Sequence, residues 1–202
     1  MHAARESLLD SALAALADRD WPGVRMVDVA SAAGVSRQTL YNEFGTKDGL
    51  ARALVRREAD RYLQGVDRAL AGPAAERERM VAVAEWTVAA ARSHPLVRAL
   101  LTGCWSGRLP APGPAPHRAG HSAGPYVPAQ RRADSGPPAP GELIAAVRHR
   151  AALVLAAGHL DAEAADLVYR CEVAVRLALS HIVAPGDLTL DHLVRDAVVR
   201  AA

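Results

Sequence analysis

The sequence predicts an all-α protein with a short N-terminal three-helix domain, a long connecting helix and a larger helical C-terminal domain. Two observations support this fold class. Apolar residues recur at helical spacing along most of the chain, and half of the 202 residues are hydrophobic, which is enough to build a core. Glycine and proline fall between these periodic segments, and we identify no segment as a strand.

The first three predicted helices are short. Leucines recur at helical spacing over residues 5–17, and a second apolar pattern runs over residues 26–33, where Gly34 ends it. Ser36 stands at the N-cap position of a third helix that extends to about Phe44. Its hydroxyl can accept a hydrogen bond from the free backbone N–H groups of the first turn.

Longer helices follow. Thr46 is placed to cap a helix over residues 47–71. The helix over residues 76–93 is apolar nearly all round, which is typical of a helix surrounded by other helices. A short helix begins at Leu96, and the last three are predicted over residues 142–157, 161–184 and 189–201.

Residues 103–141 differ from the rest of the chain in composition. They hold nine of the 13 prolines and seven glycines, which predicts a loop or a disordered insert. We expect one domain over residues 1–46 and a second over residues 47–202 that contains this insert.

Composition also limits the classes of function. The sequence shows no membrane span and no signal peptide, so a cytoplasmic location is expected. Cys104 and Cys171 lack metal-ligand spacing and are expected to be unpaired thiols. We predict neither a metal nor a cofactor, and the dispersed histidines are expected at the surface or at helix ends: His149, His159, His181 and His192.

The segment around Gly34 satisfies the steric needs of a helix-turn-helix. Ala30 is small where two helices would cross, Gly34 can adopt positive φ at the turn, and Leu40 can pack the second helix inward. Polar residues are then left near the outer, N-terminal side of that second helix, where a recognition helix meets base edges in the major groove.

The chemistry of these residues suits DNA. Arg37 can bond guanine or a phosphate, Gln38 and Asn42 can pair with adenine, and the Thr39 methyl can touch thymine. Tyr41 and the start of the long helix are better placed to hold phosphates. The predicted DNA-binding residues are Ser36, Arg37, Gln38, Thr39, Tyr41, Asn42, Thr46 and Lys47.

The segment from Arg5 to Leu54, which includes AGVSRQTLYNEFGTKDGL, resembles the N-terminal domain of the TetR family of bacterial transcriptional regulators. The rest of the chain agrees with that family only in helical architecture. The resemblance implies a homodimer on a roughly palindromic operator, usually repressing, and released when a small molecule enters a pocket in the second domain.

The predicted DNA-binding domain over residues 1–46, referred to below as the head, departs from the family pattern in two places. Glu43 stands where members commonly carry His, and Arg25 stands where Ser or Thr commonly caps the second helix. Residues 1–50 also hold five Arg or Lys against seven Asp or Glu, a balance of −2. A generic polyanion binder would not have this balance, so binding is expected to be specific or strongly salt-sensitive.

Two further sites are predicted in the second domain. An effector pocket is expected among the middle helices, whose apolar character favours a hydrophobic ligand; plain core packing is the alternative. Its predicted lining residues are Tyr62, Trp86, His94, Leu100 and Trp105. The last two helices are expected to form a four-helix bundle with those of a second subunit, unless they cover their own domain. The predicted interface residues are Leu167, Val175, Leu179, Leu193, Val194 and Val198.

Two other functions stay open at this stage. One is an enzyme with a helical pocket, although no paired carboxylates, nucleophile motif or phosphate loop stand out. The other is a helical interaction or ligand-binding protein whose DNA-binding head has weakened, for which Glu43 and the acidic balance of the head argue.

Overall fold

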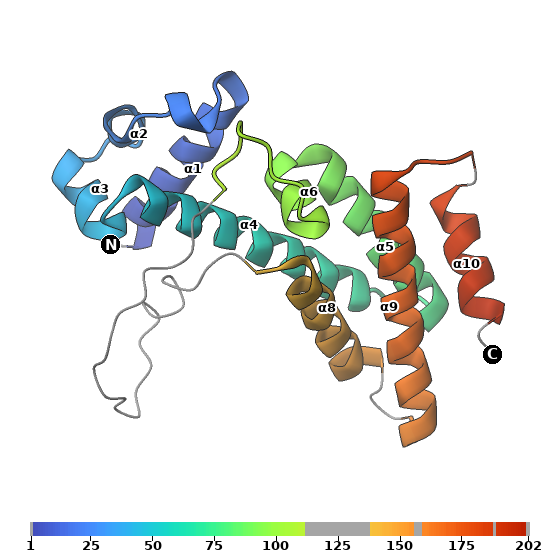
Figure 1. Ribbon diagram of the computed structural model, residues 1–202. Coiled ribbons are helices and arrows are strands. Elements are labelled where there is room, and N and C mark those ends of the chain that lie inside the picture. Colours follow the sequence, from blue (N-terminus) through green and yellow to red (C-terminus); the bar gives the residue numbers. More distant parts are fainter. Residues whose placement is uncertain (1, 112–137, 156–158, 188, 201–202) are drawn as a thin grey trace, which may run out of the picture. The chain divides into compact units, whose positions relative to one another are not determined.

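A computed structural model describes residues 2–111, 138–155, 159–187 and 189–200 of the chain. Within these ranges the backbone is helix, turn and loop, without a strand, so the predicted all-α class is confirmed. The helices are α1 (His2–Asp18), η1 (Trp21–Gly23, a 3-10 turn), α2 (Met26–Ala32), α3 (Arg37–Phe44), α4 (Lys47–Leu70), α5 (Glu76–Ser93), α6 (Pro95–Thr102), α8 (Pro140–Leu155), α9 (Asp161–Val183) and α10 (Leu190–Arg200) (Figure 1).

The predicted helices are all present, and their ends differ from the predicted ends by only a few residues. The turn η1 is the addition, because Pro22 at its start favours the tight helical φ. Residues 103–111 form a loop as predicted. The remainder of the predicted insert up to residue 137 and the predicted end of α8 at residues 156–157 lie outside the described residues.

The chain divides into two compact units, and the division falls within α4 at Arg57–Glu58. The first unit takes in residues 1–57 and a segment that starts at Trp105. In this unit α1 packs against α2 and α3, and the three share one apolar core. The buried side chains of this core include Leu8, Leu9, Ala12, Val29, Ala30, Leu40, Phe44 and Leu50.

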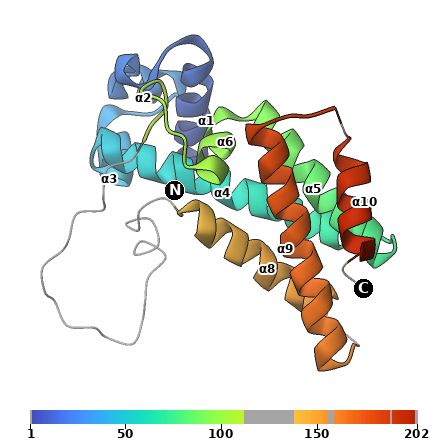
Figure 2. The same cartoon turned by 45° about the vertical axis from the view of Figure 1, so that its right-hand side comes forward.

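The second unit takes in residues 58–104 and 138–202. As predicted, α5 is central to it: α5 contacts α6, α9 and α10, and eight of its residues are buried. The long helix α9 lies between α8 and α10, as both views show (Figures 1 and 2). No described helix is long and apolar enough to cross a membrane.

Candidate nucleic-acid interface

The turn between α2 and α3 is closed by backbone hydrogen bonds around Gly34. The Gly34 amide donates to the Ser31 carbonyl (3.1 Å) and the Val35 amide donates to the Ala30 carbonyl (3.0 Å). Gly34 has a φ of 68°, which a residue with a Cβ adopts only at a cost. The glycine therefore sets the angle at which α3 leaves α2.

Ser36 caps α3 as predicted. Its Oγ accepts from the Thr39 amide at 3.0 Å and lies 2.8 Å from the Thr39 hydroxyl. Because α3 has only eight residues, this cap contributes much of the order of its first turn.

The two faces of α3 differ sharply in burial. Leu40 is 0% exposed and Phe44 is buried with it, which anchors the helix to α1 and α2. The outer face carries the predicted base-reading residues Arg37, Gln38 and Asn42, all exposed. Thr39 is half-buried at the edge of this face, and Tyr41 is 51% exposed at the other edge.

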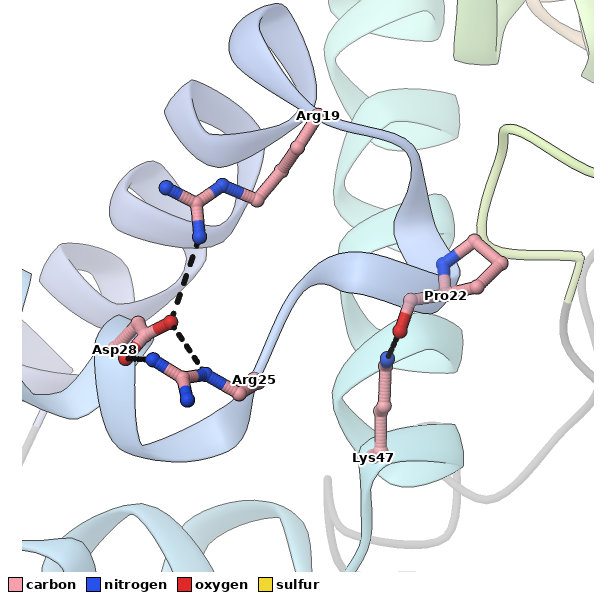
Figure 3. Close-up of polar contacts among 5 residues, drawn as sticks. All are labelled: Arg19, Pro22, Arg25, Asp28 and Lys47. Carbon is pink, nitrogen blue, oxygen red and sulfur yellow. Dashed lines mark hydrogen bonds and ion pairs between the residues drawn. The ribbon is translucent and has the colours of Figure 1, made fainter.

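The start of α4 lies just beyond α3. The Thr46 hydroxyl accepts from the Gly49 amide at 3.0 Å and so caps α4, as predicted. Lys47 is held in place, because its Nζ donates to the Pro22 carbonyl at 3.1 Å (Figure 3). The same Nζ lies 5.2 Å from the centroid of the Trp21 ring. The sequence did not indicate that η1 positions this lysine.

The turn η1 is itself held by the loop that follows α6. The Trp21 amide donates to the Arg108 carbonyl at 2.8 Å, and the Arg108 Nε donates to the Asp20 carboxylate at 2.6 Å. This hydrogen bond raises the pKa of the Arg108 guanidinium above its ordinary value. Arg108 lies inside residues 103–141, which were predicted as a loop or a disordered insert. The composition of that segment gave no sign of a contact with η1.

Arg25, the unusual N-cap of α2, makes no side-chain bond to the helix backbone. Instead its guanidinium donates twice to the Asp28 carboxylate, at 2.9 and 3.0 Å, and Arg19 lies 3.5 Å from the same carboxylate (Figure 3). The hydrogen bond from Arg25 lowers the pKa of Asp28. One acidic residue of the head is therefore matched by two arginines.

A glycine-closed turn, a capped outer helix and a polar outer face define a helix-turn-helix protein. Residues 8–54 match the model of the family described as bacterial regulatory proteins, tetR family. The resemblance to the TetR family is thereby confirmed, and the chain carries the helix-turn-helix domain of that family.

Individual relatives agree with this assignment. The transcriptional regulator AlkX of Mycobacterium tuberculosis is 42% identical over 100 residues, which are 49% of this chain and 47% of the relative. The transcriptional activator FasR of Mycolicibacterium smegmatis is 35% identical over 81 residues, 40% of this chain and 37% of the relative. The chain thus matches about half, or less, of the length of these curated relatives.

Solved structures extend the likeness of fold to nearly the whole chain. The TetR family repressor AlkX from a Dietzia strain covers 98% of this chain, and this chain covers 92% of it, at 22% identity and a TM-score of 0.51. A regulator of the TetR/AcrR family from Thermobifida fusca covers 98%, with 95% of it covered, at 17% identity and a TM-score of 0.55.

The predicted effector-pocket residues differ in burial, and four of the five belong to the second unit. Tyr62 is 2% exposed and its hydroxyl lies 3.1 Å from that of Thr87; burial raises its pKa to about 12. The Trp86 Nε1 donates to the Tyr62 carbonyl at 3.0 Å. Leu100 is buried, His94 is exposed at the end of α5, and Trp105 belongs to the first unit.

Two grooves in the second unit are lined by other residues. One, of about 380 Å³, lies between α8 and α9 and is lined by three alanines, Val168 and Tyr169, together with the charged residues Arg148 and Glu172. Another, of about 520 Å³, lies where α5 meets the ends of α9 and α10, and includes Arg92 and His181. The Arg92 Nη2 donates to the His181 Nε2 at 3.2 Å. Among the described residues no three His, Cys, Asp or Glu side chains gather as a metal site would require.

The predicted dimer residues divide into two groups. Val175 and Val194 are 1% and 0% exposed, because they face the interior of their own unit, and this part of the prediction is corrected: they are core residues. Leu167, Leu179 and Leu193 are half-buried. The side chain of Val198 lies outside the described residues.

Proposed function

We propose that this protein regulates transcription by binding a palindromic DNA operator as a homodimer and acts as a repressor that a small hydrophobic effector releases. One observation carries the proposal: α3 is fixed on its inner face by Leu40 and presents Arg37, Gln38 and Asn42 to solvent. These side chains are those that pair with guanine and adenine in the major groove.

The two flanks of α3 support the proposal. A helix with its side chains is about 10–12 Å across, and the major groove is about 12 Å wide, so the flanks of an inserted helix meet the phosphate walls. Tyr41 lies on one flank with its ring half-exposed. The capped start of α4, with Lys47 held at Pro22, supplies N–H groups and a cation of the kind that binds phosphate.

The effector class and its coupling to DNA are the less direct part of the proposal. The apolar helices α5 and α6 favour a hydrophobic ligand, and the Dietzia repressor is described as implicated in the biodegradation of n-alkanes. Because α4 runs on from the recognition helix into the second unit, an effector that favours one position of α4 would shift operator affinity.

The two alternative functions, a protein with a weakened DNA-binding head and an enzyme with a helical pocket, are less well supported. A weakened head was suggested by its acidic balance, but the Asp28 carboxylate is paired with Arg25 and Arg19, and Glu43 lies 3.5 Å from Arg5. Pairing leaves the net charge unchanged, but residues 51–57 of the same unit add three arginines and no acidic residue. Residues 1–57 therefore hold eight Arg or Lys against seven Asp or Glu, and the acidic balance does not extend over the whole segment. An enzyme with a helical pocket has no support among the described residues beyond the surface grooves.

Selection from random duplexes tests the proposal. The purified protein is incubated with random-sequence duplexes at about 0.1 M salt, where phosphate contacts still contribute strongly, and bound DNA is sequenced after several rounds. An enriched palindrome supports a dimeric, sequence-specific regulator. If the protein is folded by circular dichroism and no sequence is enriched, the proposed function is wrong.

A further inference from the structure

Arg5, in the first turns of α1, forms an ion pair with Glu43 on the recognition helix α3. The Arg5 Nη1 lies 3.5 Å from the Glu43 Oε2, and the guanidinium carbon lies 4.8 Å from the centroid of the Phe44 ring. The Arg5 and Glu43 side chains are 28% and 19% exposed. The guanidinium is therefore fixed on two sides, by a carboxylate and by an aromatic face.

This pair lies on the flank of α3 opposite Tyr41. Glu43 follows Thr39 by four residues, so the two share one edge of the helix, whereas Tyr41 is rotated by about 200° from Glu43. From the sequence, Tyr41 was predicted to hold a DNA phosphate on its flank of α3. On the other flank the sequence offers Thr39 and the Glu43 carboxylate but no cation, and the structure brings a cation to this flank from α1.

We propose that Arg5 binds a phosphate of the DNA backbone along this second flank and that Glu43 is the residue that positions it. A guanidinium has five N–H donors, and the contact with Glu43 takes one of them, so others remain for a phosphate oxygen. The proposal rests on the proposed function. It assigns to Glu43 a role opposite to that of a repelling charge.

The two possible roles of Glu43 predict opposite effects of Glu43→Gln on the affinity for DNA. If Glu43 only repels phosphates, Glu43→Gln tightens DNA binding, as removal of the exposed carboxylate of Asp48 on α4 would. If Glu43 positions Arg5, Glu43→Gln weakens binding, because the guanidinium loses its fixed geometry. Asp48→Asn is thus the matched control: the same charge change in the same unit, on a carboxylate without this contact to Arg5.

The test measures binding of wild type, Arg5→Ala, Arg5→Lys, Glu43→Gln and Asp48→Asn to a duplex of unselected sequence by fluorescence anisotropy over a range of salt. One phosphate contact contributes a slope of about 0.9 in log K against log salt, which is about eightfold in affinity at 0.1 M salt. Arg5→Ala is expected to lose about this slope and this factor for each subunit that contacts the duplex. Arg5→Lys is expected to recover the slope but only part of the affinity, because lysine lacks the planar fork.

Melting curves of each variant separate loss of fold from loss of contact, because loss of a phosphate contact alone lowers the salt slope of a variant that still melts as a folded protein. The inference is overturned if Arg5→Ala keeps the wild-type slope, or if Glu43→Gln tightens binding as Asp48→Asn does. Either result leaves the proposed function standing, since wild type still binds DNA. If wild type binds neither this duplex nor any selected one, both are wrong.

Discussion

Gly65, in the interior of α4, lies against the ring of Trp86 on α5, and the substitution Gly65→Ala tests this packing. A Cβ placed on Gly65 would lie 2.0 Å from Trp86 Cε2 and 2.1 Å from Cζ2. Those distances are far inside van der Waals contact, so the indole has to move. The ring is also held by the hydrogen bond from its Nε1 to the Tyr62 carbonyl at 3.0 Å.

Opposing terms set the size of the effect. Alanine is favoured over glycine within a helix by about 1 kcal/mol, which would stabilise the variant. Overpacking of a fitted core costs about 1–3 kcal/mol, and loss of the indole hydrogen bond costs about 1 kcal/mol more. The steric terms therefore win, and we expect a net loss of about 1–3 kcal/mol.

Thermal unfolding followed by far-UV circular dichroism measures this loss. For a chain of this size, 1 kcal/mol corresponds to a melting-temperature shift of about 2–4 °C, so Gly65→Ala is expected to melt about 2–12 °C below wild type. Gly141→Ala, at the start of α8, is the control, because no atom lies within 4 Å of its added Cβ. It is expected to melt no lower than wild type.

The result that refutes this reasoning is a Gly65→Ala variant as stable as wild type or more stable. Such a result would mean that Trp86 moves into open space at no cost. Because Trp86 is half-buried, that space would be either solvent or a cavity of the kind that the predicted effector pocket requires. A destabilised variant instead places Trp86 in the fixed packing of α4 on α5.

Other predictions concern the head and the thiols. Ser36→Ala removes the N-cap of α3 and is expected to cost about 1 kcal/mol in unfolding free energy, measured by urea titration; an unchanged value would show that the cap is dispensable. Arg108→Ala frees η1 and with it Lys47, and is expected to weaken DNA binding in a salt-dependent way, which equal slopes for variant and wild type would contradict. Burial raises the pKa of Cys171 to about 12, so at pH 8 a thiol reagent is expected to label exposed Cys104 quickly and Cys171 only on unfolding. Because unfolded Cys171 ionises from about pH 8.5 while the folded thiol keeps its proton, this group is expected to lower stability as pH rises from there toward about 12, and a Cys171→Ala variant should lack that part of the decline.

Much of the helical architecture followed from local patterns. Gly34, Ser36 and Thr46 act through backbone bonds to residues within five positions, so the sequence shows both partners at once. The inward position of Leu40 followed equally well from helical periodicity.

The contacts that the sequence did not predict join residues far apart in the chain. Arg5 meets Glu43 across 38 positions, and Arg108 meets Asp20 across 88. A surface arginine has no periodicity that names its partner, so such pairs emerge only when helices pack. The inward face of α9 is equally hard to identify from the sequence, because the helix is apolar on several sides. Val175 was for this reason assigned to the dimer interface although it is a core residue.

The ratio of affinities for a selected duplex and a scrambled duplex of the same length tests the central claim most directly. It is measured for wild type and for Gln38→Ala at one salt concentration, so that phosphate contacts cancel. The account predicts that wild type prefers the selected duplex and that Gln38→Ala loses about 1–3 kcal/mol of that preference per half-site, about 5- to 150-fold for each, while its affinity for the scrambled duplex stays unchanged. A wild type that binds both duplexes equally would contradict the central claim, and a preference that Gln38→Ala leaves unchanged would show that Gln38 does not read DNA sequence.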